Sequence, residues 1–220
     1  MGQAGWLLYE TGRVAELAAF LRGLPKQEVS GMNEEVRELA AGLIHAECGE
    51  ADSAIHVLSE VCARTGELAR PPRGPSRIAI LATAAAVLGH PAVCDAMPRD
   101  EARRMGASLA SLLIDHRDTF ALAGWPAVLL GSKQRYIGLA YLATGQPDKA
   151  EQHLVRAVED DRDFAVLHVR ARFDLARARI RQPASHAEGI AELVRVQQKA
   201  EELTMPQLAA QAAAELRRPG

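Results

Sequence analysis

Residues 136–161, with the sequence YIGLAYLATGQPDKAEQHLVRAVEDD, decide the fold because they have the pattern of two helices joined by a tight turn. Counting from Gly131 as position 1, small residues occupy positions 8 (Gly138), 15 (Gly145) and 20 (Ala150), and Leu154 stands at position 24. Small residues at these points allow two helices to cross closely. A hairpin of this kind cannot bury its apolar face alone and must stack on neighbours. The segment therefore predicts a stacked helical-repeat architecture.

The turn glycine recurs earlier in the chain. Gly12, Gly49 and Gly89 align with Gly145, at spacings of 37, 40 and 56 residues. A strict repeat of this kind takes about 34 residues, so the array is irregular. The repeat at Gly89 is degenerate because its second helix is interrupted around Pro98. An extra helix over residues 99–116 would fill most of the longest interval.

More helices are expected after the strong hairpin, over residues 164–181, 186–203 and 206–217, and the last would cap the array. No segment alternates with period two for long enough to predict a strand. The sequence therefore predicts an all-α, right-handed helical-hairpin solenoid of about ten to twelve helices. We treat 1–220 as one unit, with an irregular half over 1–120 and clearer repeats over 127–220.

Composition excludes several classes of protein. The 220 residues carry a formal net charge of −2, whereas nucleic-acid-binding domains usually have a basic excess, so no direct nucleic-acid binding is expected. Cys48, Cys62 and Cys94 are too few for a disulfide framework and fit a reducing compartment. The longest uncharged apolar run, residues 78–88, is too short to span a bilayer. We expect a cytoplasmic protein without a membrane span.

The chain resembles a known family over nearly its full length. It is similar to the C-terminal tetratricopeptide-like region of bacterial signal-transduction ATPases, of transcriptional regulators of the LuxR, MalT and AfsR types, and of cyclase-associated ATPases. The matching segments are GWLLYETGRVAEL (5–17), LIHAECGEADSAIHVL (43–58), GSKQRYIGLAYLATGQPDKAEQHLVRAVE (131–159), RARFDLARARI (170–180) and QKAEELTMPQLAAQAAAEL (198–216). The resemblance implies a superhelical sensor or partner-binding module in a bacterial signalling protein.

The sequence departs from that family in two ways. It contains no GxxxxGK[ST] phosphate-binding loop, and it stops at Gly220, where a DNA-binding domain would begin. ATPase activity and DNA binding are therefore not expected to carry over. The chain is either a fragment of such a regulator or a free-standing relative.

Arginines mark one half of the expected concave groove, which first-helix positions 2, 5, 9, 12 and 13 of each hairpin would line. The strong hairpin and the next one place there Arg135, Leu139, Arg170, Phe173, Arg177 and Arg181. Guanidinium groups suit carboxylates and phosphates, so the row could grip an acidic peptide, a C-terminal carboxylate or an anionic small molecule. The alternative is that the arginines pair with acids of the chain itself, such as Asp160, Asp161 and Asp174.

The N-terminal half of the groove is mostly apolar. The same positions there include Trp6, Tyr9, Leu39 and Leu43, with Thr83 as an isolated hydroxyl. Such a lining could receive an amphipathic helix or an apolar ligand. It could equally be buried against an adjacent helix or against a second copy in a homodimer.

Patterns typical of metal sites and catalysis are weak. His45 and Cys48 are one turn apart, with His56 and Cys62 on the next helix, but no CxxC or HxxxH motif accompanies them, so no metal is predicted. Asp115 and His116 are adjacent and would point in different directions on a helix, which is unsuited to a catalytic pair. We predict no catalytic residue and no cofactor.

The favoured hypothesis is a non-catalytic regulatory or scaffold module that binds a protein or peptide segment in its groove. A small-molecule sensor using the same groove remains open. So does an enzyme of specialised metabolism, for which His45, His116 and His168 are the residues to test.

Overall fold

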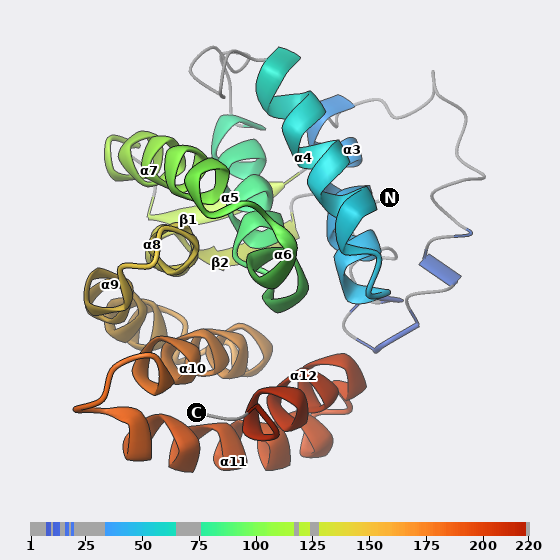
Figure 1. Ribbon diagram of the computed structural model, residues 1–220. Helices are drawn as coiled ribbons and strands as arrows, with labels where there is room; N and C mark the ends of the chain where they lie inside the picture. Colours follow the sequence, from blue (N-terminus) through green and yellow to red (C-terminus); the bar gives the residue numbers. More distant parts are fainter. Residues whose placement is uncertain are drawn as a thin grey trace.

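The computed structural model describes residues 8–9, 11–13, 16–17, 19, 34–64, 76–116, 119–123 and 128–218. Nearly all of them are helical (Figure 1). The helices are α3 (Glu34–Glu47), α4 (Ala51–Arg64), α5 (Ser76–Leu88), α6 (Pro91–Ala96), α7 (Arg99–Ile114), α8 (Lys133–Ala143), α9 (Pro147–Asp160), α10 (Ala165–Ile180), α11 (His186–Glu202) and α12 (Pro206–Leu216). The helices expected after the strong hairpin and the extra helix after Pro98 are confirmed.

The turns of the α3–α4 and α8–α9 hairpins have the same construction. Gly49 and Gly145 have φ angles of 78° and 73°, in the left-handed region that glycine adopts without steric cost. The amide of each glycine donates to the carbonyl three residues back, and the next amide donates to the carbonyl five residues back. These two bonds form the helix-ending motif that glycine favours, which explains the recurrence of glycine at position 15.

The close helix crossing expected at Gly138 is present. A Cβ atom on Gly138 would lie 2.5 Å from Cγ of Leu154, which is completely buried. Positions 8 and 24 of the strong hairpin therefore meet, and only glycine leaves room for the leucine. The α8–α9 pair is thus a tetratricopeptide-like hairpin in its packing as well as in its sequence.

The structure departs from the prediction of no strands at one place. β1 (Phe120–Ala123) and β2 (Val128–Ser132) pair antiparallel, with a register shift between Ala121 and Leu122. These strands are too short to show period-two alternation, which is why the sequence pattern missed them. β1 packs against α5, with Ala121 fully buried, so the hairpin forms one wall of the helical array.

The repeat at Gly89 is degenerate, as predicted. Its second helix, α6, has only six residues and ends before Pro98, after which α7 begins. The side chain of His90 caps α6 by accepting a hydrogen bond from the amide of Ala92, at 3.3 Å. This cap fixes the imidazole ring of His90 at the turn between α5 and α6.

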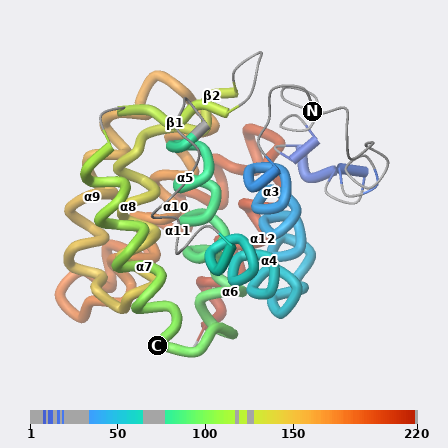
Figure 2. Tube along the Cα trace, turned by 90° about the horizontal axis from the view of Figure 1, so that it is seen from above, coloured from blue at the N-terminus to red at the C-terminus, as the bar shows by residue number. Residues whose placement is uncertain are grey.

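Helices α7 to α12 pack against one another in chain order, and α5 packs against α3, α7 and α8. The array curves so far that its last helix returns to its first described segments (Figures 1 and 2). Gln211 of α12 donates to Glu47 of α3 at 2.7 Å, and Arg218 pairs with Asp95 of α6. Pro206 lies against Gly12, where a Cβ atom would be 2.3 Å from the Pro206 Cγ. The solenoid is therefore closed, and its concave side faces an interior.

The apolar core falls into two main clusters. The larger extends from α3 to α10, and the smaller joins α10, α11 and α12. A few charged side chains are buried with them, among them Arg177 of α10, which is only 1% exposed. No described helix is long and apolar enough to cross a membrane.

Candidate functional site

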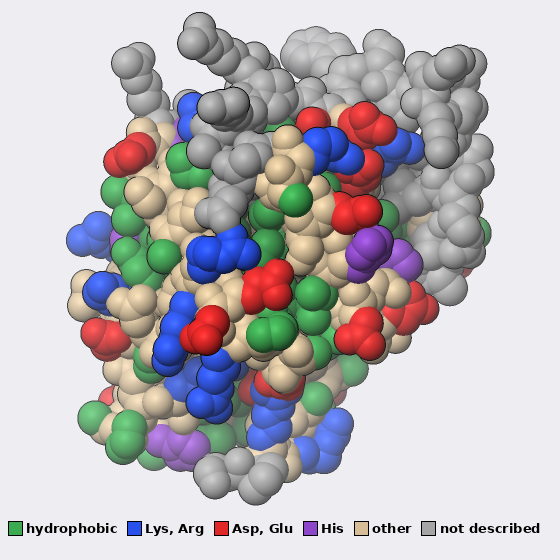
Figure 3. Space-filling model, turned by 45° about the horizontal axis from the view of Figure 1, so that its top comes forward, with side chains coloured by type: hydrophobic (Ala, Val, Ile, Leu, Met, Phe, Trp, Pro, Cys, Tyr) green, Lys and Arg blue, Asp and Glu red, His purple; other side chains and the backbone are tan. Residues whose placement is uncertain are grey.

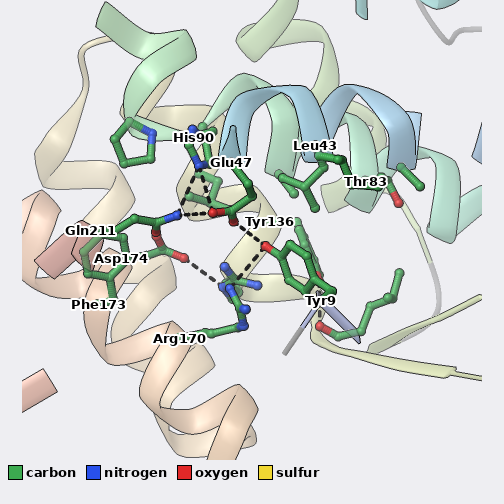
Figure 4. A pocket seen from close by; sticks show the side chains of 18 of the residues that line it. Tyr9, Leu43, Glu47, Thr83, His90, Tyr136, Arg170, Phe173, Asp174 and Gln211 are labelled. Atoms are coloured by element: carbon green, nitrogen blue, oxygen red, sulfur yellow. Dashed lines mark hydrogen bonds and ion pairs between the residues drawn. The ribbon is translucent and has the colours of Figure 1, made fainter. Parts of the chain in front are cut away.

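A partly open cavity of about 160 Å³ lies on the concave side of the solenoid (Figure 4). Its wall comes from α3, α5, the turn into α6, α8, α10, α12, both strands and the first described residues of the chain. Apolar side chains provide most of it, namely Leu17, Val36, Ala40, Leu43, Ile44, Ala86, Pro91, Ala123, Val128, Leu130, Leu139 and Phe173. The cavity is thus an apolar space bounded by segments far apart in the sequence.

The structure brings most of the predicted groove residues together at this cavity. Those that line it are Tyr9, Leu43, Arg135, Leu139, Arg170, Phe173 and Arg177. Leu39 does not, because it is completely buried in the larger core cluster. Arg181 follows the last residue of α10, is exposed, and does not line the cavity. Trp6 lies outside the described residues.

Asp174 forms ion pairs with two of the arginines that were predicted to line the groove. The Nε atom of Arg135 donates to Oδ2 of Asp174 at 2.8 Å, and Nη1 of Arg177 donates to Oδ1 at 3.3 Å. All three groups are almost fully buried. Removing one charge of such a buried pair would leave the other uncompensated, which is strongly destabilising. At these two positions the arginines pair with an acid of the chain itself, which was the alternative to ligand binding.

Arg177 makes additional contacts with the protein. Its Nη1 atom donates to the carbonyl of Gly89 at 2.8 Å, and its Nε atom lies 3.8 Å from Oε1 of Glu215. Burial alone would lower the pKa of Arg177, but electrostatic interactions with Cys94, Asp174 and Glu215 raise it overall. The guanidinium therefore stays charged and ties α10 to the α5–α6 turn.

A second polar group connects the first and last parts of the chain. Tyr9 Oη donates to Oε1 of Glu47 at 2.6 Å, and Gln211 Nε2 donates to Oε2 of the same carboxylate at 2.7 Å. The Nε2 atom of His90 lies 3.8 Å from that Oε2 and 3.2 Å from Gln211 Nε2. Arg170 donates to Tyr9 Oη at 3.3 Å and stands over its ring, 4.7 Å from the centroid. We call these five residues the clasp.

Glu47 is the shared acceptor of the clasp, and its side chain is only 3% exposed. Burial by itself would raise its pKa, but hydrogen bonding and charge from His90, the charge of Arg170 and the Tyr9 hydroxyl together lower it. Glu47 is therefore held as a carboxylate by its neighbours. Nothing in the repeat pattern marks His90 or Gln211 as partners of this group, and sequence reasoning missed both.

The residues considered for metal binding and catalysis lie elsewhere. His45 Nδ1 is 2.5 Å from Oε2 of Glu50, and burial raises the pKa of the Cys62 thiol to about 11. His168 Nδ1 lies 3.1 Å from the carbonyl of Val158, and the carbonyl of His116 accepts from Lys133. None of these lines the cavity. Across the described ranges, no group of three or more His, Cys, Asp or Glu side chains could hold a metal ion.

The outer surface has mixed charge. Figure 3 shows acidic and basic side chains interleaved on the described part of one face. Many of the charged side chains form ion pairs between helices, such as Arg179 with Glu151 at 2.8 Å.

No protein-family model and no curated protein sequence matches this chain. Two solved structures of MamA, a tetratricopeptide-like helical protein, are similar in the arrangement of their helices. One, a mutant, is 17% identical, covers 91% of this chain and 93% of its own, and has a TM-score of 0.37. The other is 15% identical, covers 91% and 92%, and has the same score.

Proposed function

We propose that this chain is a non-catalytic regulatory or scaffold module that binds a protein or peptide partner by receiving one of its side chains in the central cavity. One observation carries the proposal: groove positions of several hairpins converge on a single, mostly apolar cavity. Apolar pockets that accept an anchor side chain supply much of the affinity in peptide recognition. The arginines hold the walls of the pocket in place through Asp174 and the clasp.

The resemblance to the sensor regions of LuxR-, MalT- and AfsR-type regulators supports a role in bacterial signal transduction. It rests on the order of the matching segments and on the ending QKAEELTMPQLAAQAAAEL. We propose that the chain works in the cytoplasm as a sensor or adaptor of that kind, alone or as part of a longer regulator. Its partner would be a segment of another signalling protein.

The test is a selection of phage-displayed random peptides on the purified chain. Binders would be depleted on the Ala86→Phe variant, because Ala86 lines the cavity from α5 and a ring at this position would fill it. The matched control is Ala107→Phe, at an exposed position of α7 that does not line the cavity.

We expect the selected peptides to share one anchor position. Their affinity, measured by calorimetry, should fall by about tenfold or more with Ala86→Phe and stay unchanged with Ala107→Phe. Peptides without a common anchor, or equal binding to both variants, would contradict the proposal.

A small-molecule sensor is the second candidate, and one observation favours it. The clasp joins the first and last parts of the chain on the cavity wall, so a ligand in the cavity would be bounded on several sides. Native mass spectrometry of the chain, purified from a cytoplasmic extract without denaturation, would show a retained mass of a few hundred daltons. A bare chain would remove this candidate.

A further inference from the structure

Most of the polar atoms on the cavity wall already have hydrogen-bond partners within the protein; Nε of Arg177 makes no hydrogen bond but lies 3.8 Å from Glu215. Thr83 donates its hydroxyl to the carbonyl of Ala79 at 2.7 Å, and Tyr136 donates to the carbonyl of Leu130 at 2.5 Å. Both oxygens of Asp174 accept from arginines, and both oxygens of Glu47 accept from the clasp. A ligand that formed hydrogen bonds with these groups would first have to break existing ones.

The charged groups around the cavity also face opposite charges within the protein. The wall carries the guanidinium groups of Arg135, Arg170 and Arg177, and the buried carboxylates of Glu47 and Asp174 face them, while Glu215 lies 3.8 Å from Arg177 and 3.1 Å from Arg218. An anion entering this cluster would lose its hydration and would meet guanidinium groups that already face carboxylates of the chain. A cation would meet the same difficulty with the opposite sign.

The size of the space limits the ligand further. Apolar cavities of about 150 Å³ are known to take up one benzene molecule. At about 160 Å³, the cavity has room for one aromatic ring and is too small for a turn of helix. Leu43, Leu139 and Phe173 lie on its wall and would contact such a ring.

We infer that the cavity binds an uncharged, apolar group of the size of a single aromatic ring, such as the side chain of phenylalanine, and discriminates against carboxylates. This inference rests on the proposed function, since it names the chemistry of the anchor side chain. It also replaces the expectation that the arginine row grips an acidic group: in the folded chain, the arginines organise the wall and leave the apolar surface to the ligand.

The test compares three ring-sized probes that differ in charge, namely 4-fluorotoluene, 4-fluorobenzoate and 4-fluorobenzylammonium. Binding to the full chain would be followed by fluorine NMR titration at neutral pH. The variants are again Ala86→Phe and the control Ala107→Phe, with circular dichroism to verify folding. If Ala86→Phe does not fold, Ala86→Leu fills less of the space. Nuclear Overhauser effects from the methyl group of the non-fluorinated analogue toluene to Leu139 and Phe173 would locate the probe independently of any variant.

We expect saturable binding of 4-fluorotoluene, at least about tenfold tighter than that of either charged probe. It should be lost when Ala86 is enlarged and kept in Ala107→Phe. Binding of 4-fluorobenzoate as tight as that of 4-fluorotoluene would overturn the inference, because it would mean that the arginines are available to anions. Absence of 4-fluorotoluene binding, or binding that survives a folded Ala86→Phe, would overturn it as well.

The two proposals fail in different ways. If 4-fluorotoluene binds at the cavity but no peptide is selected, the partner-binding function is wrong and the chemistry of the cavity stands. If peptides bind through the cavity with an acidic anchor, the function stands and the inference is wrong.

Discussion

At the scale of single residues, the most unusual conformation is that of Thr204. It has a φ of 56°, in a region that β-branched residues rarely adopt. Its amide donates to Glu201 and the next amide donates to Ala200, the same pair of bonds that ends helices at Gly49 and Gly145. Thr204 therefore occupies a turn position that elsewhere in the chain belongs to glycine.

We predict that Thr204→Gly stabilises the chain by about 1 kcal/mol, because it relieves the strain of a left-handed β-branched residue. The gain is smaller than the full strain because glycine also gives the unfolded chain more freedom. Urea denaturation would measure the change. The reverse exchange, Gly145→Thr, should destabilise the chain, and a stable Gly145→Thr variant would refute the explanation.

Glu47 predicts a dependence of stability on pH. Its folded-state pKa is lowered, so its contribution is present well above the ordinary pKa of glutamate and is lost as the pH falls through the lowered value. We expect Glu47→Gln to cost about 1–3 kcal/mol near neutral pH and progressively less below about pH 4.

The check on this prediction is denaturant unfolding of both proteins across that range. Glu60→Gln is the control, because Glu60 is exposed and 3.6 Å from His56, and such a pair contributes little. A difference between wild type and Glu47→Gln that does not shrink at low pH would contradict the prediction.

At the scale of the helical hairpin, a substitution at Gly138 tests how much the stability of the hairpin depends on the close packing of α8 against α9. Gly138→Ala places a Cβ atom 2.5 Å from Cγ of Leu154, so α8 and α9 must move apart. We expect a loss of about 1–3 kcal/mol, typical of overpacking a core. Because the two residues are in contact, Leu154→Val should recover part of the loss in the double variant. Additive effects in thermal unfolding would show that the crossing is looser than the structure indicates.

The same hairpin shows what the sequence could predict. Positions 8 and 15 need glycine for reasons of local geometry. The spacing of these glycines alone therefore predicted the helices on both sides of Gly49 and Gly145. The strands escaped prediction because FALA and VLLGS are too short to show a period, and their pairing depends on contact with α5. Leu39 was assigned to the groove by position, but neighbouring helices bury it.

The sequence predicted most of the residues that line the cavity, but not the hydrogen-bond and ion-pair partners of those residues. Most groove residues reached the cavity because first-helix positions face inward in every hairpin. The partners of those residues depend on how far the array curves. Asp174 could be suspected from its position one helical turn before Arg177, whereas His90 and Gln211 come from a turn and from the last helix. No local sequence pattern indicates that these distant segments come into contact.

At the scale of the whole molecule, the clasp determines how firmly the cavity is held. Gln211 and Glu47 are 164 residues apart in the sequence and share one hydrogen bond. We predict that Gln211→Ala destabilises the chain by about 1–2 kcal/mol and increases hydrogen exchange in α3 and α12, while α8 and α9 keep their protection. Gln197→Ala, which removes an exposed hydrogen bond to Glu201 within α11, is the control. Unchanged exchange in α3 would show that the closure does not depend on this bond.

The closed shape has a consequence for the route by which the chain folds. In an open helical array every contact is between neighbours, so folding can nucleate anywhere and spread. Here Arg170 reaches Tyr9 across 161 residues, and Gln211 reaches Glu47 across 164. Bringing together such distant segments is entropically costly until the intervening helices are formed. We therefore expect the joining of the two ends to be the last and slowest event of folding, and the native structure to open first at the ends.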